Sequence, residues 1–235
     1  MANVLSKSSK FTVSFSGIDG AGKSTQIANL TEHLEAAGLK VGLVTFWDDV
    51  ATLKAFRESV GHKVFQGEKG VGSPEAPIAR RDKNVRSPLV SICRLGFYLF
   101  DALSLRSKMH AVQSSAADVI IFDRFLYDEF ANLSLQNPVI RLYIRGLMKL
   151  IRQPQVSFFL DADPVEARAR KPEYPLDFIH SNRKAYLALS RILGGVTIIP
   201  PLPLAAAKAA VVEHIFGADF SPFPIPPTAV SLVAE

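Results

Sequence analysis

The sequence contains a single cysteine among 235 residues, which excludes an internal disulfide and a zinc site built from cysteines. It also lacks an uninterrupted apolar run long enough to cross a membrane. The most apolar helix-like stretch, residues 87–105, contains Arg94 and Asp101, and the uncharged stretches 192–207 and 220–234 contain three and four helix-breaking prolines. We therefore expect no association with a membrane.

Charge of one sign is not in large excess either. The chain has 27 basic and 22 acidic side chains, a net charge of +5, which suits a protein that handles phosphates or nucleotides and is too weak to indicate nucleic-acid binding. Residues 1–10 have no apolar segment typical of a secretory signal, so we expect a cytoplasmic protein. The five histidines show no metal-ligand spacing, and Cys93 is expected to pack in the core.

What the sequence does contain is a regular alternation of short apolar runs with longer helical patterns. With 48% hydrophobic residues the chain can form a sizeable core, and its length fits one domain. This alternation predicts an α/β fold, a three-layer α/β/α arrangement around a five-stranded parallel sheet. Strands are expected at residues 11–15, 40–46, 119–122, 156–160 and 196–199, and helices at 24–37, 50–60, 88–115, 126–151, 164–171, 178–192 and 203–216.

The ends of this alternation predict the domain boundaries. Residues 11–217 form the expected domain, with an N-terminal extension over 1–10 and a proline-rich tail over 218–235. Residues 61–87 are rich in glycine, proline and charge and fit neither pattern. Connections of that length are usually functional or disordered.

Residues 17–24 match the phosphate-binding loop pattern G-x-x-x-x-G-K-[ST], directly after the first predicted strand and at the start of the first predicted helix. Glycines allow successive backbone N–H groups to turn toward an anion, and the helix N-terminus adds a partial positive charge. We expect Lys23 to reach the β- and γ-phosphates of ATP and Ser24 to bind Mg²⁺. The nucleotide-binding residues are expected to be Gly17, Gly20, Ala21, Gly22, Lys23, Ser24 and Thr25.

A second anchor, Asp123-Arg124-Phe125, follows the predicted buried strand 119–122. A carboxylate at the carboxyl end of a strand beside the phosphate-binding loop is well placed for the Mg²⁺ shell or for the nucleophile. Asp123 is therefore a candidate metal-binding and catalytic residue.

Three segments together resemble thymidylate kinases over roughly residues 11–200. The first is Phe15-Ser-Gly-Ile-Asp-Gly-Ala-Gly-Lys-Ser-Thr-Gln26, in which Asp19 occupies the family's acidic loop position. The others are the Asp-Arg-aromatic triplet, whose Arg124 would contact the acceptor phosphate, and residues 160–171, with a Pro-x-Glu-Ala helix start. The resemblance implies strand order 2-3-1-4-5, ATP and Mg²⁺ as cofactors, and a homodimer.

The resemblance also implies a short arginine-bearing lid, over about residues 168–177. The loop itself carries no cation besides Lys23, so it is similar to those family members that bring basic residues from the lid to the transferred phosphoryl group. Arg168, Arg170 and Lys171 are the candidates, with Arg168 and Arg170 pointing in different directions because they are two residues apart. Arg170 is slightly favoured for catalysis.

The acceptor site matches the family less well. Phe46-Trp-Asp-Asp-Val50 stands where the family usually has Arg-Glu-Pro-Gly-Gly. Arg57 is either a ligand of the acceptor phosphate or a solvated helix residue. Arg94, Tyr98 and Asp101 share one helical stripe, where Tyr98 would stack on the base and Arg94 and Asp101 either bind the base or form a structural pair.

The segment after Arg124 departs from the family as well. Asp128 and Glu129 stand where the family has small or amide residues, and such carboxylates would repel an anionic acceptor unless they face a basic patch or an amine. The basic segment 80–86 is either that patch or a solvated loop. Glu129 and Asp101 could instead accept a hydrogen bond from a base amino group.

These patterns predict an enzyme that transfers the ATP γ-phosphoryl group to a nucleoside monophosphate, with dTMP as the leading acceptor and no nucleic-acid partner. A deoxynucleoside kinase, with Asp48 or Asp49 as the base for a sugar hydroxyl, is the alternative enzyme. A non-catalytic nucleotide-binding regulator is the alternative of another class. The basic stripe Arg141, Arg145, Lys149 and Arg152 is interpreted as a solvated helix face.

Overall fold

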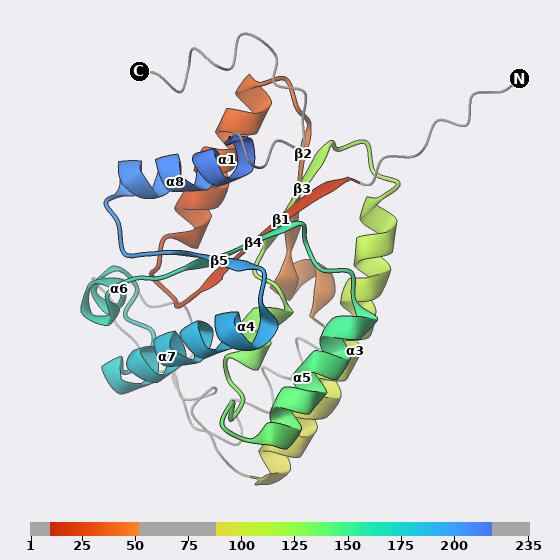
Figure 1. Ribbon diagram of the computed structural model, residues 1–235, viewed down its shortest axis with the longest axis vertical. Helices are drawn as coiled ribbons and strands as arrows, with labels where there is room; N and C mark the ends of the chain where they lie inside the picture. The colour runs from red at the N-terminus through yellow and green to blue at the C-terminus, as the bar shows by residue number, and fades with distance from the viewer. Residues whose placement is uncertain (1–9, 52–87, 218–235) are drawn as a thin grey trace, which may run out of the picture.

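The computed structural model describes residues 10–51 and 88–217 (Figure 1), so the expected N-terminal extension, tail, basic segment 80–86 and Arg57 lie outside the described residues. Within them, five parallel strands form one sheet in the order β2-β3-β1-β4-β5, which confirms the expected order. The strands are β1 (Phe11–Gly17), β2 (Val41–Thr45), β3 (Val119–Asp123), β4 (Val156–Leu160) and β5 (Val196–Ile199).

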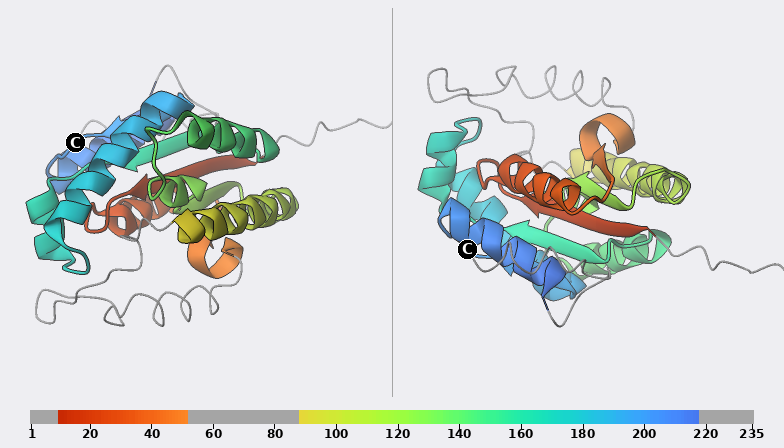
Figure 2. Two further views of the ribbon diagram at one scale, coloured as in Figure 1. Left: turned by 90° about the horizontal axis from the view of Figure 1, so that it is seen from below. Right: turned by 90° about the horizontal axis from the view of Figure 1, so that it is seen from above.

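Helices cover both faces of the sheet (Figures 1 and 2). One face carries α1 (Lys23–Ala36) and α8 (Leu204–Phe216), and the other carries α3 (Pro88–Val112), α4 (Leu126–Phe130), α5 (Pro138–Leu150) and α7 (Leu176–Leu193). The short helices α6 (Pro164–Arg170) and η1 (Phe46–Val50) follow β4 and β2. In the described residues, no helix combines the length and the apolar character needed to span a bilayer.

Strand β1 separates two apolar cores, because its alternating side chains face opposite layers. Val13 and Phe15 pack in the core under α1 and α8, and the Phe15 ring stacks on Phe158 with 5.2 Å between centroids. Ser14 and Ser16 are also fully buried but bond instead to Ser157 and Asp128. The central strand therefore carries polar groups into the side of the sheet covered by α4 and α7.

The strand register places the candidate residues at one edge of the sheet. Phe15 pairs with Asp123, and Gly17 pairs with Leu160, so the phosphate-binding loop, the end of β3 and the end of β4 lie side by side. This is the carboxyl edge of the strands, where open α/β sheets bind their ligands.

Two expectations from the sequence are wrong. The helix expected over 126–151 is two helices, α4 and α5, because Pro138 has no backbone N–H to continue a helix and Asn137 caps a new one by accepting from Val139 N at 2.9 Å. Cys93 is exposed on α3 rather than packed in the core.

Candidate active site

The phosphate-binding loop connects β1 to α1, as the motif predicts. Gly20 and Gly22 have φ values of +83° and +90°, a left-handed conformation that glycine adopts without strain. Gly22 is the N-cap of α1 and provides no side-chain cap, so the first backbone N–H groups of α1 have no intrahelical acceptor. These donors at a helix N-terminus fit the phosphates of a nucleotide.

Lys23 is buried and lies inside the loop. Its Nζ donates to the carbonyl oxygens of Gly17 and Ile18 at 2.8 and 2.9 Å. Burial, and after it the nearby Arg124 guanidinium, lower the pKa of Lys23 from 10.5 to about 8. The ammonium group is therefore held at the loop by carbonyl dipoles and is poorly solvated, which strengthens its attraction to an anion.

Gly20 packs directly against the backbone of α6. A Cβ atom at position 20 would lie 2.1 Å from the carbonyl oxygen of Ala167, a contact that no side chain can make. The approach of α6 therefore leaves no room for a larger side chain at this loop position. Any second cation at the transferred phosphoryl group has to come from another segment.

Arg124 lies between two carboxylates at the end of β3. Its Nη2 donates to Asp19 in the phosphate-binding loop, and its Nη1 donates to Asp128 Oδ1 at 3.1 Å. Burial acts to lower the pKa of the Arg124 guanidinium, but Asp19 and Asp128 outweigh it and the net shift is upward. Arg124 remains a cation at any accessible pH.

The backbone of Arg124 is strained. Its φ of +69° makes it the one described residue other than glycine with a positive φ. For such a residue this conformation costs about 1–2 kcal/mol and persists only where the surroundings fix it, a situation common at functional sites. Here the Arg124 N–H donates to the Phe15 carbonyl at 3.0 Å, and both ends of the guanidinium are held.

Asp128 is buried beneath Arg124 and gathers donors from three elements. Its Oδ2 accepts from Ser16 Oγ of β1 at 2.5 Å and from the Phe125 backbone N–H at 3.2 Å. Its Oδ1 accepts from the Tyr186 hydroxyl of α7 at 2.7 Å, as well as from Arg124. Burial, followed by the charge of Asp128, raises the pKa of Tyr186 well above 10, so this hydroxyl keeps its proton and donates.

The basic residues of the lid are divided among different partners. Lys171 Nζ lies 3.9 Å from Asp19 Oδ1 and 3.1 Å from Oε1 of the buried Glu173. Arg168 donates from Nε to the Tyr174 carbonyl at 3.2 Å, and Arg170 donates to the Glu166 carbonyl at 3.3 Å. Of these three cations, Lys171 is the one paired with the phosphate-binding loop in this conformation.

The two candidate metal ligands, Ser24 and Asp123, line one surface groove beside α1. No group of three or more His, Cys, Asp or Glu side chains in the described ranges could hold a metal by itself. One hydroxyl and one carboxylate fit Mg²⁺ in a nucleotide complex, because Mg²⁺ takes oxygen ligands and is usually held by one or two protein groups together with phosphates and waters.

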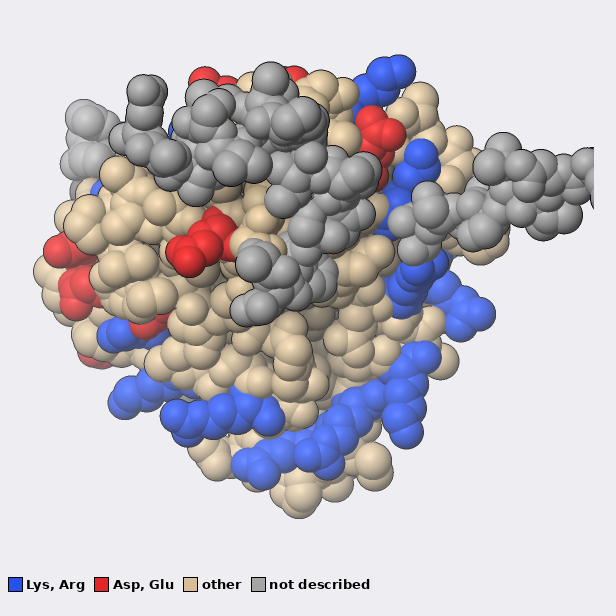
Figure 3. All heavy atoms as spheres, turned by 45° about the horizontal axis from the view of Figure 1, so that its top comes forward, with Lys and Arg blue, Asp and Glu red and all other residues tan. Residues whose placement is uncertain are grey.

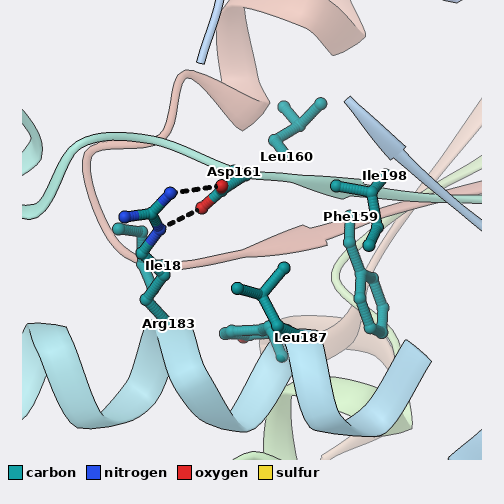
Figure 4. Close-up of a pocket in the computed structure, with 8 residues that line it drawn as sticks. Ile18, Phe159, Leu160, Asp161, Arg183, Leu187 and Ile198 are labelled. Atoms are coloured by element: carbon teal, nitrogen blue, oxygen red, sulfur yellow. Dashed lines mark hydrogen bonds and ion pairs between the residues drawn. The ribbon is translucent and has the colours of Figure 1, made fainter. Parts of the chain in front are cut away.

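A bidentate ion pair ties α7 to the end of β4 (Figure 4). Arg183 donates from Nε and Nη2 to the two carboxylate oxygens of Asp161 at 2.6 and 2.7 Å. Ile18 of the phosphate-binding loop lies beside this pair, and the Asp161 N–H donates to the Ile199 carbonyl at 2.9 Å. The pair fixes α7 against the loop edge of the sheet.

The residues expected to bind the base lie on α3 and α4, on one side of the sheet. Tyr98 and Asp101 are buried in α3, and Glu129 is buried in α4, which packs against α3. Arg94 is half-buried one helical turn before Tyr98. The structure thus places these four residues on two helices that pack against each other.

The proposed bases of a nucleoside kinase lie in η1. Asp49 Oδ2 accepts from the Thr45 backbone N–H at 2.8 Å, and Asp49 Oδ1 pairs with Lys108 of α3 at 2.9 Å. The Lys108 hydrogen bond lowers the pKa of Asp49 below its usual 3.8. Asp49 therefore links β2, η1 and α3, and a carboxylate stabilised in this way is a weak base. Asp48 is exposed.

Sequence reasoning missed three residues of the Arg124 cluster as site residues: Ser16, Asp128 and Tyr186. A signal for Asp128 was present, since Arg124 and Asp128 are four residues apart, the spacing of helix-side ion pairs. The sequence left open whether the segment 80–86 is a basic patch facing Asp128 or a solvated loop; that segment lies outside the described residues, and the structure shows Arg124 as a partner of Asp128. Ser16 and Tyr186 come from distant elements, and no local pattern connects them.

Known proteins resemble the chain in sequence and in fold. No protein-family model matches it. A probable thymidylate kinase of Methanosphaera stadtmanae is 25% identical over 193 residues, which are 80% of this chain and 87% of that protein. The thymidylate kinase of Chlorobaculum parvum is 26% identical over 171 residues, 68% of this chain and 64% of that protein.

Solved structures agree on the fold. The thymidylate kinase of Candida albicans superposes with a TM-score of 0.56 at 15% identity, covering 88% of this chain and 91% of the other. The thymidylate kinase of Ehrlichia chaffeensis gives a TM-score of 0.54 at 20% identity, covering 88% and 98%. At these identities the likeness to both structures shows a shared fold.

Proposed function

We propose that this chain, thymidylate kinase-like in sequence and fold, transfers the γ-phosphoryl group of ATP to dTMP and forms dTDP and ADP. One observation carries the proposal: Asp19 of the phosphate-binding loop is bonded directly to Arg124 at the end of β3. The proposed donor-phosphate loop and the proposed acceptor-phosphate arginine thus share one partly buried contact. Two bound phosphates would meet there without a covalent enzyme intermediate.

The donor half of the site would hold ATP through the loop. The N–H groups at the start of α1 and the Lys23 ammonium would bind the β- and γ-phosphates. Ser24 and Asp123, which line one groove, would hold Mg²⁺. When bound, Mg²⁺ supplies charge neutralisation between the phosphates. Lys23 already lies in a poorly solvated position, so little reorganisation is needed when the phosphates arrive.

The acceptor half would bind the monophosphate at Arg124 and, outside the described residues, at Arg57. Tyr98 would stack on the pyrimidine. Asp101 and Glu129 would discriminate between bases, because a carboxylate can accept a hydrogen bond from the amino group of cytosine, and thymine has no such group. We therefore expect dTMP to be used with a weaker preference over other pyrimidine monophosphates than a site without these carboxylates would give.

The lid would complete the charge around the transferred group. Because Gly20 leaves no room for a side chain, the extra cation would come from Arg168, Arg170 or Lys171. Both arginines are exposed and bonded to backbone carbonyls of their own segment, so they can turn toward ATP without breaking a buried ion pair.

A homodimer is part of the proposal. Apolar side chains are exposed on neighbouring helices of one sheet face, which is unusual unless a partner covers them. They are Ile92, Leu99, Phe100 and Leu103 of α3 and Val139 and Leu142 of α5. By contrast, the face in Figure 3 shows Lys and Arg side chains spread along its lower and right-hand margins among neutral residues. Sedimentation at several concentrations, with Phe100→Glu as the disrupting variant, measures the oligomeric state.

The experiment that tests the function is ADP formation from ATP and Mg²⁺ with dTMP, dUMP, dCMP or thymidine as acceptor. The proposal expects turnover with monophosphates, highest with dTMP. Faster turnover with thymidine would support a nucleoside kinase, and binding of ATP with no turnover would support a regulator. The comparisons favour neither alternative, and Asp49 is engaged with Lys108.

A further inference from the structure

Asp128 is a buried carboxylate that has no role in the proposed reaction as described so far. Its side chain is 4% exposed, yet its oxygens accept from β1, from the turn after β3, and from α7. A buried carboxylate is costly unless donors surround it, and here four donors do. Two of them, Ser16 and Tyr186, come from distant elements, so the carboxylate is fixed in place by the tertiary fold.

The fixed carboxylate determines the position of the Arg124 guanidinium. Asp128 holds Nη1 and Asp19 holds Nη2, so the guanidinium is fixed from two sides. A guanidinium has five N–H donors in a rigid plane. Among the described residues these two carboxylates are its ion-pair partners, which leaves N–H groups for a ligand.

We infer that Asp128 is a positioning residue: it holds Arg124 in the orientation in which the arginine binds the phosphate of the acceptor nucleotide. The inference rests on the proposed function, since it assumes that Arg124 receives this phosphate. Asp128 does not contact the acceptor itself. It acts by preparing the arginine, so that the arginine side chain loses little freedom when the phosphate binds.

An orienting role and a purely electrostatic role of Asp128 predict opposite changes in acceptor affinity when its charge is removed. A carboxylate near the acceptor repels its phosphate, so removal of the Asp128 charge would strengthen acceptor binding if charge alone mattered. If Asp128 orients Arg124, removal of the charge frees the guanidinium and weakens acceptor binding. A neutral variant of similar shape therefore separates the two accounts by the direction of the change.

The central variant is Asp128→Asn, compared with Asp118→Asn as the control. Asp118 precedes β3 at the opposite edge of the sheet, where its exposed carboxylate accepts from the Lys40 backbone N–H at 2.9 Å, so the control removes one negative charge away from the site. We expect Asp128→Asn to raise the KM and the calorimetric Kd for dTMP at least about tenfold, the equivalent of 1.4 kcal/mol. The KM for ATP should stay within about twofold in both variants, and Asp118→Asn should leave the KM for dTMP within the same limit.

A double-mutant cycle tests whether Asp128 acts through Arg124. In an Arg124→Ala background, Asp128→Asn should change the Kd for dTMP by less than about twofold, because the group it positions is gone. The same large loss in both backgrounds would overturn the inference, as would an unchanged or tighter Kd in Asp128→Asn alone. Tyr186→Phe removes the hydroxyl that donates to the Asp128 carboxylate and should raise the Kd for dTMP by a smaller factor. This variant provides the test if Asp128→Asn does not fold.

The proposed function and this inference fail separately. Absence of dTMP binding and turnover in the wild-type protein would refute the function itself. A wild-type enzyme that phosphorylates dTMP, with an Asp128→Asn variant that binds dTMP equally well or better, would refute only the role of Asp128.

Discussion

The donor and acceptor halves of the site are built in different ways. The proposed donor half is one continuous segment, residues 17–24, whose backbone amides and single lysine would bind ATP. The proposed acceptor half centres on Arg124, whose contacts with Asp19 and Asp128 connect β1, the β3–α4 turn and α7, and it includes the expected base-binding residues of α3 and α4. The difference teaches that the donor half depends on loop conformation, whereas the acceptor half depends on how distant elements are packed.

The largest effect is expected when Lys23, the cation of the donor half, is removed. Lys23→Ala should lower kcat/KM by roughly a thousandfold, since a single cation at the transferred phosphoryl group contributes that much in related chemistry. The fold should persist because, within residues 10–51 and 88–217, the hydrogen bonds of the ammonium go to two carbonyls of its own loop. ADP formation together with circular dichroism checks both parts, and near-normal turnover in a folded variant would exclude Lys23 from the reaction.

The same lysine should reduce stability in the absence of nucleotide. Its folded pKa, about 8, lies below its unfolded value of 10.5, so between these pH values the unfolded state binds more protons and stability rises with pH. Lys23→Met should therefore raise the free energy of unfolding at pH 7 by up to roughly 3 kcal/mol, the equivalent of that pKa difference. The gain should shrink as the pH approaches 10, and urea denaturation of both proteins at pH 7 and 10 measures it. An equal gain at both pH values would contradict the burial of a charged lysine.

The contact between the loop and α6 should appear as a difference in stability between two glycine-to-alanine variants. Gly20→Ala places a methyl group 2.1 Å from the Ala167 carbonyl, whereas Gly38→Ala, with a similar φ, meets no atom within 4 Å. We expect Gly38→Ala to cost about 1 kcal/mol from backbone conformation alone and Gly20→Ala at least about twice that. Thermal or urea unfolding checks the comparison, and equal losses would show that α6 moves away freely.

The smallest effect concerns the two lid arginines, which are bonded to carbonyls of their own segment in this conformation. Neutralising Arg168 and Arg170 together should lower kcat at least about tenfold with little change in the KM for ATP, the pattern of interactions made in the transition state. Lys171→Gln provides the comparison, because Lys171 is the lid cation beside Asp19. If the arginine pair leaves kcat unchanged and Lys171→Gln lowers it, the catalytic cation is the lysine.

The donor half could be predicted from the sequence because its information is local. The motif predicts the loop, and the alternation of strand and helix patterns predicts the five strands. The order of the strands in the sheet was expected from the resemblance to thymidylate kinases, and the structure has that order. Asp123 also follows from its place after an apolar run. Even here the sequence did not reveal why the loop is neutral, since the approach of Ala167 to Gly20 is a tertiary contact.

The acceptor half could be predicted only in part because its contacts join residues far apart in the chain. Arg124 was expected at the site, but its ion pair with Asp128 was not, although their helical spacing was a signal for it. The bonds of Asp128 to Ser16 and Tyr186 span 112 and 58 residues, separations at which no sequence pattern operates. The split between α4 and α5 was signalled by Asn137-Pro138 and was masked by the continuing apolar periodicity.

The central claim is that two phosphate groups meet across the Asp19–Arg124 contact. Its most direct test is the conversion of dTMP to dTDP by ATP, with both products quantified, in the wild type and in Arg124→Gln. The account predicts equal amounts of dTDP and ADP in the wild type, and a loss of at least about a hundredfold in kcat/KM for dTMP in the variant, carried mainly by the KM for dTMP. Release of ADP without dTDP, or a variant that uses dTMP as well as the wild type does, would contradict it.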